Sequence, residues 1–246
     1  MMRIPNSGFL LLLMLIMACS SGPAEQQLES KNGFAVIVKP ETGEQLATFA
    51  GGCFWALQEA MIELKGVNRV ISGYAGGTSA NPDYAKVVSK TAGHAEAVQV
   101  YYDPKVISFE QLCEAFFHAH DPTQVDGQGP DLGIEYRSIA FFRSPEEYRA
   151  IRRVIDQLEA SVYGKNQVVT ELLPFKIIYP AEMEHQDYYK RNLWDSYIRK
   201  ISRPKVEKLR REMPGLIKSE YLKSWKTTVF QEGTASNLAF LSENYQ

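Results

Sequence analysis

The feature that most constrains the fold of this chain is a glycine pair followed by a cysteine and two aromatic residues, from Gly51 to Trp55. The preceding stretch, Leu46 to Ala50, is short and largely apolar, as is typical of a buried strand. From Leu57 to Leu64, apolar side chains recur at the spacing of one helix face. The sequence therefore predicts a strand, a tight turn and a helix, with Cys53 in the first helical turn.

That position suits a reactive cysteine. Unpaired backbone N–H groups and the helix dipole favour a thiolate at Cys53 over a thiol. Gly51 and Gly52 permit a tight turn that leaves the sulfur uncovered, while Phe54 and Trp55 place apolar walls beside it. The alternative is a small buried cysteine that only packs, and position alone does not separate the two.

The N-terminus predicts export. Arg3 precedes an apolar run from Phe9 to Ala18, which is too short to cross a bilayer as a mature helix but suits the hydrophobic region of a secretion signal. The run ends at Cys19 and resembles a bacterial lipoprotein signal, in which the cysteine carries the lipid. We predict a lipoprotein signal peptide over residues 1–18; an ordinary signal peptide or an uncleaved anchor is the alternative.

The segment after the signal predicts an anchored protein. Residues 19–35 begin with a polar stretch rich in Ser, Glu and Gln, which predicts a flexible tether. Lipidation at Cys19 would place the protein in the bacterial cell envelope, on the periplasmic or extracytoplasmic side of a membrane. Ser20 after this cysteine resembles lipoproteins of the outer membrane.

Lipidation would leave two of the three cysteines, Cys53 and Cys113. An oxidising compartment would permit a disulfide between them. However, Cys113 shares one helical face with Phe109, Leu112 and Phe116. We therefore predict that Cys113 packs in the core.

A buried carboxyl group is predicted on a second strand, Ala95 to Tyr102. There Glu96 alternates in phase with Val98, Val100 and Tyr102, on the more apolar face. Burial would raise the pKa of Glu96 toward a value suited to a general acid near neutral pH. The alternative is a glutamate at a strand end that reaches solvent.

Further helices and strands alternate along the chain. Ser108 with Gln111, and Ser144 with Pro145 and Glu147, are capping patterns that begin helices. Other predicted strands lie at 67–74, 138–142, 167–173 and 175–179, and Pro174 separates the last two. The helix that begins after Ser144 is predicted to end at about Val162, and another helix is predicted over 181–192. The basic stretch 199–211 predicts a solvated helix face, with attraction to anionic lipid as the alternative.

The chain is predicted to form one α/β domain. This domain spans residues 36–225, and residues 226–246 are a tail of unknown role. The formal net charge of -2 gives no reason to expect nucleic acid. The long segment from His118 to Arg137 predicts a functional loop. His118, His120 and Asp121 suggest a metal only weakly, because the two histidines point apart at a helix end, so we predict no metal site.

A series of short motifs resembles the peptide methionine sulfoxide reductases of the A type. The resemblance spans most of the region from Ala47 to Asn192. Its motifs are Gly52-Cys53-Phe54-Trp55, Gly73-Tyr74-Ala75-Gly76-Gly77, Asn81-Pro82-Asp83-Tyr84, Gly93-His94-Ala95-Glu96, Tyr102-Asp103-Pro104, His120-Asp121-Pro122-Thr123, Gln128-Gly129, Asp131-Leu132-Gly133 and Tyr136-Arg137-Ser138.

The resemblance implies a fold and a reaction. The fold would be a two-layer α/β (α+β) sandwich with a ferredoxin-like core, a mixed sheet and additional C-terminal helices. The family reduces methionine S-sulfoxide, free or in proteins, and so repairs oxidised proteins. Cys53 would attack the sulfoxide sulfur and become a sulfenic acid, with Glu96 as proton donor.

Other roles also follow from the resemblance. Tyr84 and Tyr136 would bind the sulfoxide oxygen, Phe54 and Trp55 would hold the substrate methyl group, and Asp131 would order the site. No bound cofactor is implied.

The chain departs from the family pattern in two places. Residues 56–58 are Ala, Leu and Gln where many members have Gly and Glu, which we expect to be a change on the helix surface. No cysteine follows Cys113, whereas many members have resolving cysteines near the C-terminus. We therefore predict that an external thiol reduces the sulfenic acid, from thioredoxin, a glutaredoxin-like protein or a small thiol.

Two other functions remain as alternatives. A thiol peroxidase also forms a sulfenic acid, but needs no pocket for a methyl group, which the aromatic pair Phe54 and Trp55 suggests. A lipid-anchored binding module would leave Cys53 incidental and Glu96 unexplained. For any of these we expect a monomer.

Overall fold

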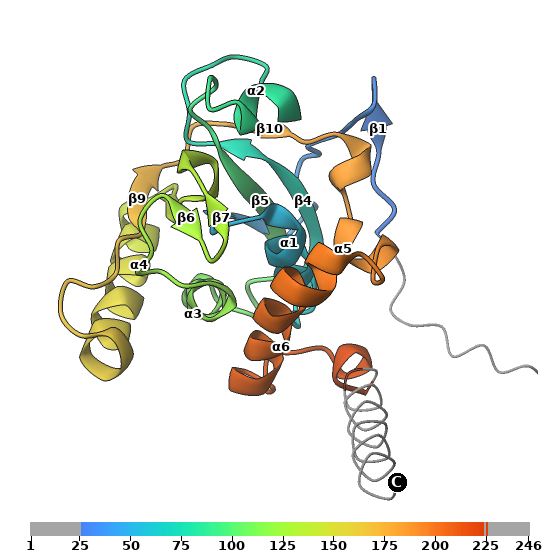
Figure 1. Ribbon diagram of the computed structural model, residues 1–246. Helices are drawn as coiled ribbons and strands as arrows, with labels where there is room; N and C mark the ends of the chain where they lie inside the picture. Colours follow the sequence, from blue (N-terminus) through green and yellow to red (C-terminus); the bar gives the residue numbers. More distant parts are fainter. Residues whose placement is uncertain (1–25, 224, 226–246) are drawn as a thin grey trace, which may run out of the picture.

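The computed structural model describes residues 26–223 and residue 225. The predicted signal peptide, the lipidation site Cys19 and the tail 226–246 lie outside the described residues. A six-stranded sheet, ordered β10-β4-β5-β3-β8-β9, organises the described chain (Figure 1). Its strands are β3 (Gln45–Ala50), β4 (Val67–Ala75), β5 (Ala95–Tyr102), β8 (Ile139–Phe142), β9 (Glu171–Pro174) and β10 (Ile178–Pro180).

The core of the fold is ferredoxin-like, as predicted. The helices α1 (Phe54–Ile62) and α3 (Phe109–Ala119) connect four central strands in the sequence β3-α1-β4-β5-α3-β8. These four strands pair antiparallel, with β3 between β5 and β8. Strand β9 then adds parallel to β8, which makes the sheet mixed. Because β3 and β5 are central strands, the end of β3, which is followed by Cys53, and the start of β5, which carries Glu96, are both buried.

Helices form the second layer. In Figure 1, α3 lies below the sheet between α4 (Pro145–Leu158) and α6 (Arg203–Glu212), and α3 packs against both. A complete capping box of Ser108 and Gln111 begins α3, and Ser144 caps α4, as predicted. Cys113 is fully buried in the core and makes no disulfide, so the prediction that it packs there is confirmed.

The tether prediction is wrong for residues 26–35. Strands β1 (Ser30–Lys31) and β2 (Phe34–Ala35) form a hairpin. Buried Ala35 packs with Ile71 and Tyr101 on the sheet face opposite the helices. The polar composition of this segment hid its packing, because Gln26 uses its amide groups to bond the backbone of β4.

The chain after β9 differs from the prediction in detail. Pro174 ends β9 instead of separating two strands, and the predicted helix 181–192 is a 3₁₀ turn (Met183–His185) followed by α5 (Tyr188–Arg191). Asp187 interrupts the helix with a φ of 49°. Its backbone N–H donates to Gln58 Oε1 at 2.8 Å. Gln58 is therefore buried at this junction, and the prediction that residues 56–58 differ only on the helix surface is wrong.

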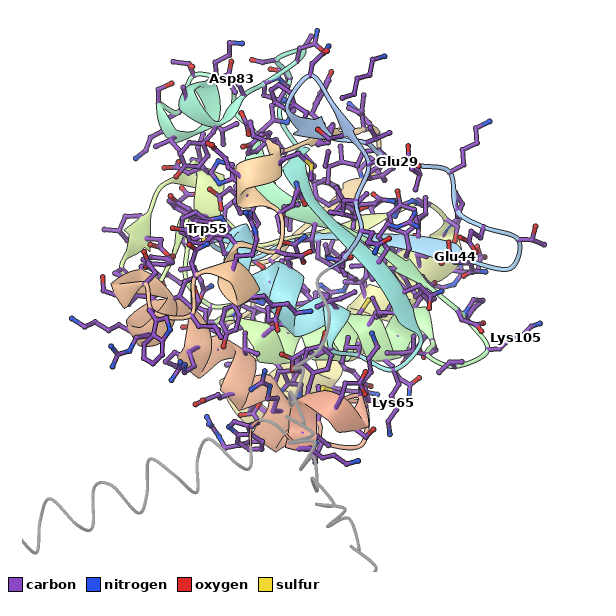
Figure 2. All side chains as sticks on the ribbon, turned by 90° about the vertical axis from the view of Figure 1, so that its right-hand side faces the viewer. Glu29, Glu44, Trp55, Lys65, Asp83 and Lys105 are labelled. Atoms are coloured by element: carbon purple, nitrogen blue, oxygen red, sulfur yellow. The ribbon has the colours of Figure 1, made fainter. Side chains whose placement is uncertain are left out.

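The predicted solvated helix face is also partly wrong. Arg210 on α6 is buried and forms a bidentate ion pair with Glu63 at the end of α1, with distances of 2.8 and 2.5 Å. Lys205 on the same helix buries its ammonium group. Lys65 and Lys105, which lie outside this basic stretch, are exposed and extend outward at the periphery of the molecule (Figure 2). Within the described residues, no helix combines the length and apolar character needed to cross a membrane.

Candidate active site

Cys53 lies at the N-terminus of α1, in the strand-to-helix turn that the sequence predicts. Gly52 has a φ of 83°, and a Cβ atom there would lie 2.6 Å from the Gln128 side chain. Only glycine fits this turn without strain. The Gly52 N–H donates to the Tyr136 carbonyl at 3.1 Å, which joins the turn to the loop before β8.

Glu96 is buried beside Cys53. Its Oε2 accepts a hydrogen bond from the Phe54 N–H at 2.9 Å, and the Cys53 thiol lies close to the same carboxyl group. Burial, with smaller contributions from the nearby Asp131 and Glu135 carboxylates, raises the pKa of Glu96 to about 8. The prediction of a buried carboxyl with a raised pKa is confirmed.

The prediction of an uncovered thiolate at Cys53 is wrong. The side chain is buried, not uncovered, and burial together with the Glu96 charge raises the pKa of the thiol well above its usual value. The nearby Trp55 N–H and Tyr197 hydroxyl act in the opposite direction and lower the pKa of the thiol. The helix N-terminus therefore does help the thiolate, but desolvation outweighs it.

Two tyrosines approach the Cys53–Glu96 pair from separate segments. Tyr84 begins the short helix α2 (Tyr84–Val88), and Tyr136 ends a 3₁₀ turn (Ile134–Tyr136). Burial raises the pKa of Tyr84 to about 12, and it raises the pKa of Tyr136 as well. Glu96 adds to both shifts, so both side chains remain neutral phenols that can donate a hydrogen bond.

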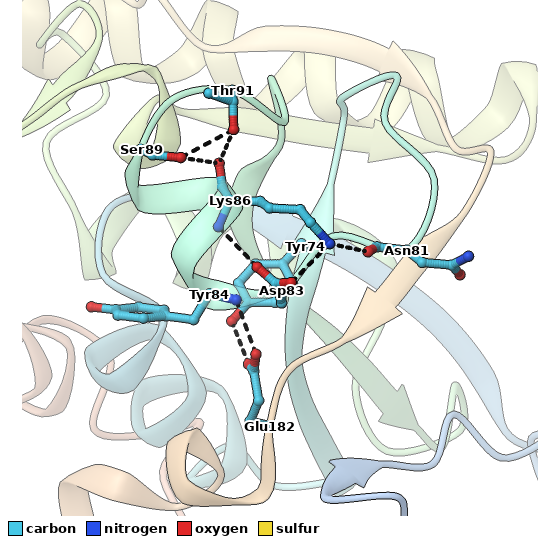
Figure 3. Close-up of polar contacts among 8 residues, drawn as sticks. All are labelled: Tyr74, Asn81, Asp83, Tyr84, Lys86, Ser89, Thr91 and Glu182. Atoms are coloured by element: carbon cyan, nitrogen blue, oxygen red, sulfur yellow. Dashed lines mark hydrogen bonds and ion pairs between the residues drawn. The ribbon is translucent and has the colours of Figure 1, made fainter.

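Glu182 holds the start of α2 in place (Figure 3). One carboxylate oxygen accepts from the Tyr84 N–H at 2.9 Å, and the other accepts from the Tyr74 hydroxyl at 2.8 Å. Asp83 caps the same helix through the Lys86 N–H. Sequence analysis missed Glu182, because its partners lie about a hundred positions away and no local pattern marks such a contact.

Asp131 meets a residue that sequence analysis also missed. Asp131, in β7 (Asp131–Leu132), accepts a hydrogen bond from the Tyr197 hydroxyl at 2.6 Å. The same hydroxyl lies beside the Cys53 thiol. Tyr197 thus joins the C-terminal part of the domain to the turn at Cys53. No periodicity or motif around Tyr197 signals this contact.

The two predicted aromatic walls differ in exposure. Trp55 is half-buried and stacks on Tyr188 with ring centroids 3.8 Å apart, and Figure 2 shows it against the C-terminal segment. Phe54 is fully buried against Tyr74 and His185. Trp55 and Tyr188 can therefore touch an apolar ligand, whereas Phe54 supports the site from behind.

The histidines of the long loop have other partners. His118 pairs with Glu212 at 2.5 Å, and His120 lies buried with its Nε2 2.7 Å from the Ser138 hydroxyl. Within residues 26–223 and 225, no group of three or more His, Cys, Asp or Glu side chains is placed to hold a metal.

Comparison with known proteins identifies the family. The family model for peptide methionine sulfoxide reductase matches residues 45–215, which include every predicted site residue that the structure describes. The chain belongs to the peptide methionine sulfoxide reductase family. Relatives in this family include the peptide methionine sulfoxide reductases MsrA of Halobacterium salinarum, 44% identical over 69% of this chain and 96% of theirs, and of Thermus thermophilus, 44% identical over 71% and 98%.

Solved structures of the reductase family share this fold. The reduced form of Mxr1 from Saccharomyces cerevisiae is 31% identical, with a TM-score of 0.59 over 64% of this chain and 91% of that one. Methionine sulfoxide reductase A of Corynebacterium diphtheriae is 30% identical, with a TM-score of 0.59 over 71% of this chain and 88% of that one. The sulfoxide reductase fold thus surrounds Cys53 and Glu96.

Proposed function

We propose that this chain reduces methionine S-sulfoxide, free or in proteins, to methionine with Cys53 as the nucleophile. One observation carries the proposal: within a fold of the peptide methionine sulfoxide reductase family, Cys53 lies beside the buried Glu96 carboxyl group, which accepts from the Phe54 N–H at 2.9 Å and has a pKa of about 8. That carboxyl group is largely protonated at neutral pH and can act as an acid. The activity serves the repair of oxidised proteins.

The reaction moves one oxygen from the substrate to Cys53. The Cys53 sulfur attacks the sulfoxide sulfur while Glu96 donates a proton to the sulfoxide oxygen. The thiol proton passes to the Glu96 carboxylate, the substrate S–O bond breaks, and an S–O bond forms at Cys53. Methionine sulfoxide is reduced by two electrons to methionine, and Cys53 is oxidised by two electrons to a sulfenic acid.

The surrounding side chains orient the substrate. The neutral hydroxyls of Tyr84 and Tyr136 bond the sulfoxide oxygen as negative charge develops on it. Trp55, stacked on Tyr188, contacts the substrate methyl group. Asp131 fixes the Tyr197 hydroxyl beside Cys53.

An external thiol completes the cycle. No cysteine follows Cys113 in the sequence, and Cys113 is fully buried within α3. A first external thiol attacks the sulfenic sulfur, which releases water and leaves a mixed disulfide. A second thiol then releases Cys53 and an external disulfide. Thioredoxin, a glutaredoxin-like protein or a small thiol can supply these groups.

The decisive experiment is a single turnover without reductant. Protein that begins at residue 22 is mixed with a methionine S-sulfoxide peptide, and methionine and lost thiols are counted per chain. We expect one methionine and one lost thiol, abolished by Cys53→Ser and unchanged by Cys113→Ala. Two lost thiols that fall to one in Cys113→Ala would make Cys113 a resolving cysteine.

The same experiment tests the other functions. No methionine from any version would reject a reductase, and consumption of a peroxide instead would indicate a thiol peroxidase. Family membership and the stacked pair of Trp55 and Tyr188 favour the reductase over the peroxidase and over a binding module.

We also propose that Cys19 carries a lipid and anchors the protein in the bacterial cell envelope, on the periplasmic or extracytoplasmic side, in the outer membrane. The support is the sequence alone, which places Cys19 directly after an apolar run of lipoprotein-signal type. Metabolic labelling with a fatty acid should mark the wild-type chain and should not mark the Cys19→Ala variant. Equal labelling of both would contradict the anchor.

A further inference from the structure

One buried cation faces the proposed active site without a role so far. Lys205, on α6, has a buried Nζ with no hydrogen-bond partner among the described residues. A Cβ atom placed on Gly52 would lie 3.6 Å from this Nζ. The ammonium group therefore lies against the turn immediately before Cys53.

The groups that face Lys205 are mostly acidic. They come from three separate segments: Asp131 in β7, Cys53 at the start of α1 and Glu96 in β5. His120, at the end of α3, is the other titratable neighbour, and burial lowers its pKa to about 4, so it is neutral. Burial lowers the pKa of Lys205, while the three acidic groups raise it and so help to retain the ammonium.

The charge of this buried space changes during the reaction. At neutral pH the Glu96 carboxyl and the Cys53 thiol are largely protonated, so Cys53 carries no charge before it attacks. When Cys53 loses its proton to attack, a negative charge appears in the same buried space. An isolated buried charge is costly. The Lys205 ammonium, which has no hydrogen-bond partner among the described residues, therefore stabilises the deprotonated Cys53 beside it.

We propose that the Lys205 ammonium balances the negative charge of the Cys53 thiolate during its attack on the sulfoxide. This inference rests on the proposed function and adds a residue to its machinery. Lys205 acts through its electric field and not as an acid or base, so it needs no proton transfer of its own. Its effect extends to Glu96, whose neutral form would be favoured further by loss of the cation.

The position of Lys205 is fixed by its helix. The buried Glu63–Arg210 ion pair joins α6 to the end of α1, the helix that begins at Cys53. A charge on a helix anchored in this way keeps a fixed distance from the sulfur, as an electrostatic contribution to catalysis requires.

The test is the pH dependence of Cys53 alkylation, measured in the full chain and resolved by peptide mass spectrometry. Rates with iodoacetamide are compared from about pH 6 to about pH 10, where they follow the thiolate fraction. Lys205→Met should raise the apparent thiol pKa by about one unit and slow alkylation about tenfold at a given pH. Lys205→Arg should retain most of the reactivity, and Lys200→Met, which removes an exposed lysine, should leave it unchanged.

Other outcomes would overturn the inference. A folded Lys205→Met protein with the alkylation profile of the unmodified chain would remove any electrostatic role, and Lys205→Gln gives the same test if the methionine variant does not fold. If Lys205→Met raises the KM for free methionine sulfoxide and leaves the alkylation profile unchanged, Lys205 binds the substrate carboxylate and does not act on the thiolate. Alkylation needs no turnover, so a shifted profile without methionine formation would reject the proposed function and not the role of Lys205.

Discussion

Glu96 concentrates the acid chemistry of the site in one buried carboxyl group. Its pKa of about 8 means that it loses its proton as the pH rises through that value. We expect Glu96→Gln to slow methionine formation about 10²-fold to 10⁴-fold, the usual contribution of a general acid. The measurement is the single-turnover rate at saturating substrate.

The pH dependence of the single-turnover rate gives a second test of Glu96. Ionisation of Cys53 makes the rate rise with pH in both the wild-type and the Glu96→Gln protein, so the ratio of the two rates reports what Glu96 adds through its proton and through its charge beside the thiol. This ratio should fall above about pH 8, because an ionised carboxyl has no proton to donate. A ratio that stays constant to pH 10 would remove Glu96 from the role of acid.

Glu182 is expected to position Tyr84 without contacting substrate. Glu182→Ala leaves the Tyr84 N–H and the Tyr74 hydroxyl without their acceptors, and an unsatisfied buried donor costs about 1–3 kcal/mol. We expect a stability loss of that size and a slower chemical step. Tyr74→Phe is the matched control, because it removes one of the two bonds and keeps the bond to Tyr84.

The Glu182→Ala and Tyr74→Phe variants together separate positioning from general stability. Chemical denaturation gives the stability of each, and single-turnover kinetics gives the rate. Equal rate losses in Tyr74→Phe and Glu182→Ala would argue against a specific role for the bond to Tyr84.

Helices α1 and α6 depend on each other through one buried ion pair. Arg210→Met leaves the Glu63 carboxylate buried without its partner, and breaking such a pair costs about 3–5 kcal/mol. We expect that loss in the free energy of unfolding, measured with urea. The double variant Glu63→Leu with Arg210→Met should regain much of it, since neither charge of the pair then remains to bury. A double variant as unstable as Arg210→Met alone would contradict this account.

The sheet as a whole is covered on both faces, and residues 26–35 contribute to the second cover. Gln26 bonds Asp187 and β4, and the Gly33 carbonyl accepts from the Met183 N–H at 2.8 Å. These contacts hold the same segment that carries Glu182. We therefore expect a chain that begins at residue 36 to unfold at lower urea concentration than one that begins at residue 26.

The truncated pair also tests whether the segment matters for the site. The shorter chain should lose activity along with stability, because Met183 lies next to Glu182. Equal unfolding midpoints for the two chains would mean that residues 26–35 add nothing to the fold.

Local patterns were enough to predict the elements that carry the chemistry. Strand β3, the turn at Cys53 and the start of α1 follow from alternating and helical spacing around a glycine pair, and the capping box at Ser108 follows from two residues three positions apart. Glu96 could be predicted as buried because its strand is apolar on the same face. Each of these features depends on neighbours within one turn or one strand.

By itself, then, the sequence determined the order of the core strands and helices from β3 to α4, the ferredoxin-like class through its motifs, and the pairing of a cysteine with a carboxyl group. Only the tertiary structure decided the electrostatics around Cys53. Tyr197, Lys205 and Glu182 reach the site from distant segments, and desolvation by the whole core gives the thiol a raised pKa where the helix N-terminus alone predicted a thiolate. Burial and electric fields sum over all surrounding atoms, whereas spacing patterns report only what lies nearby along the chain.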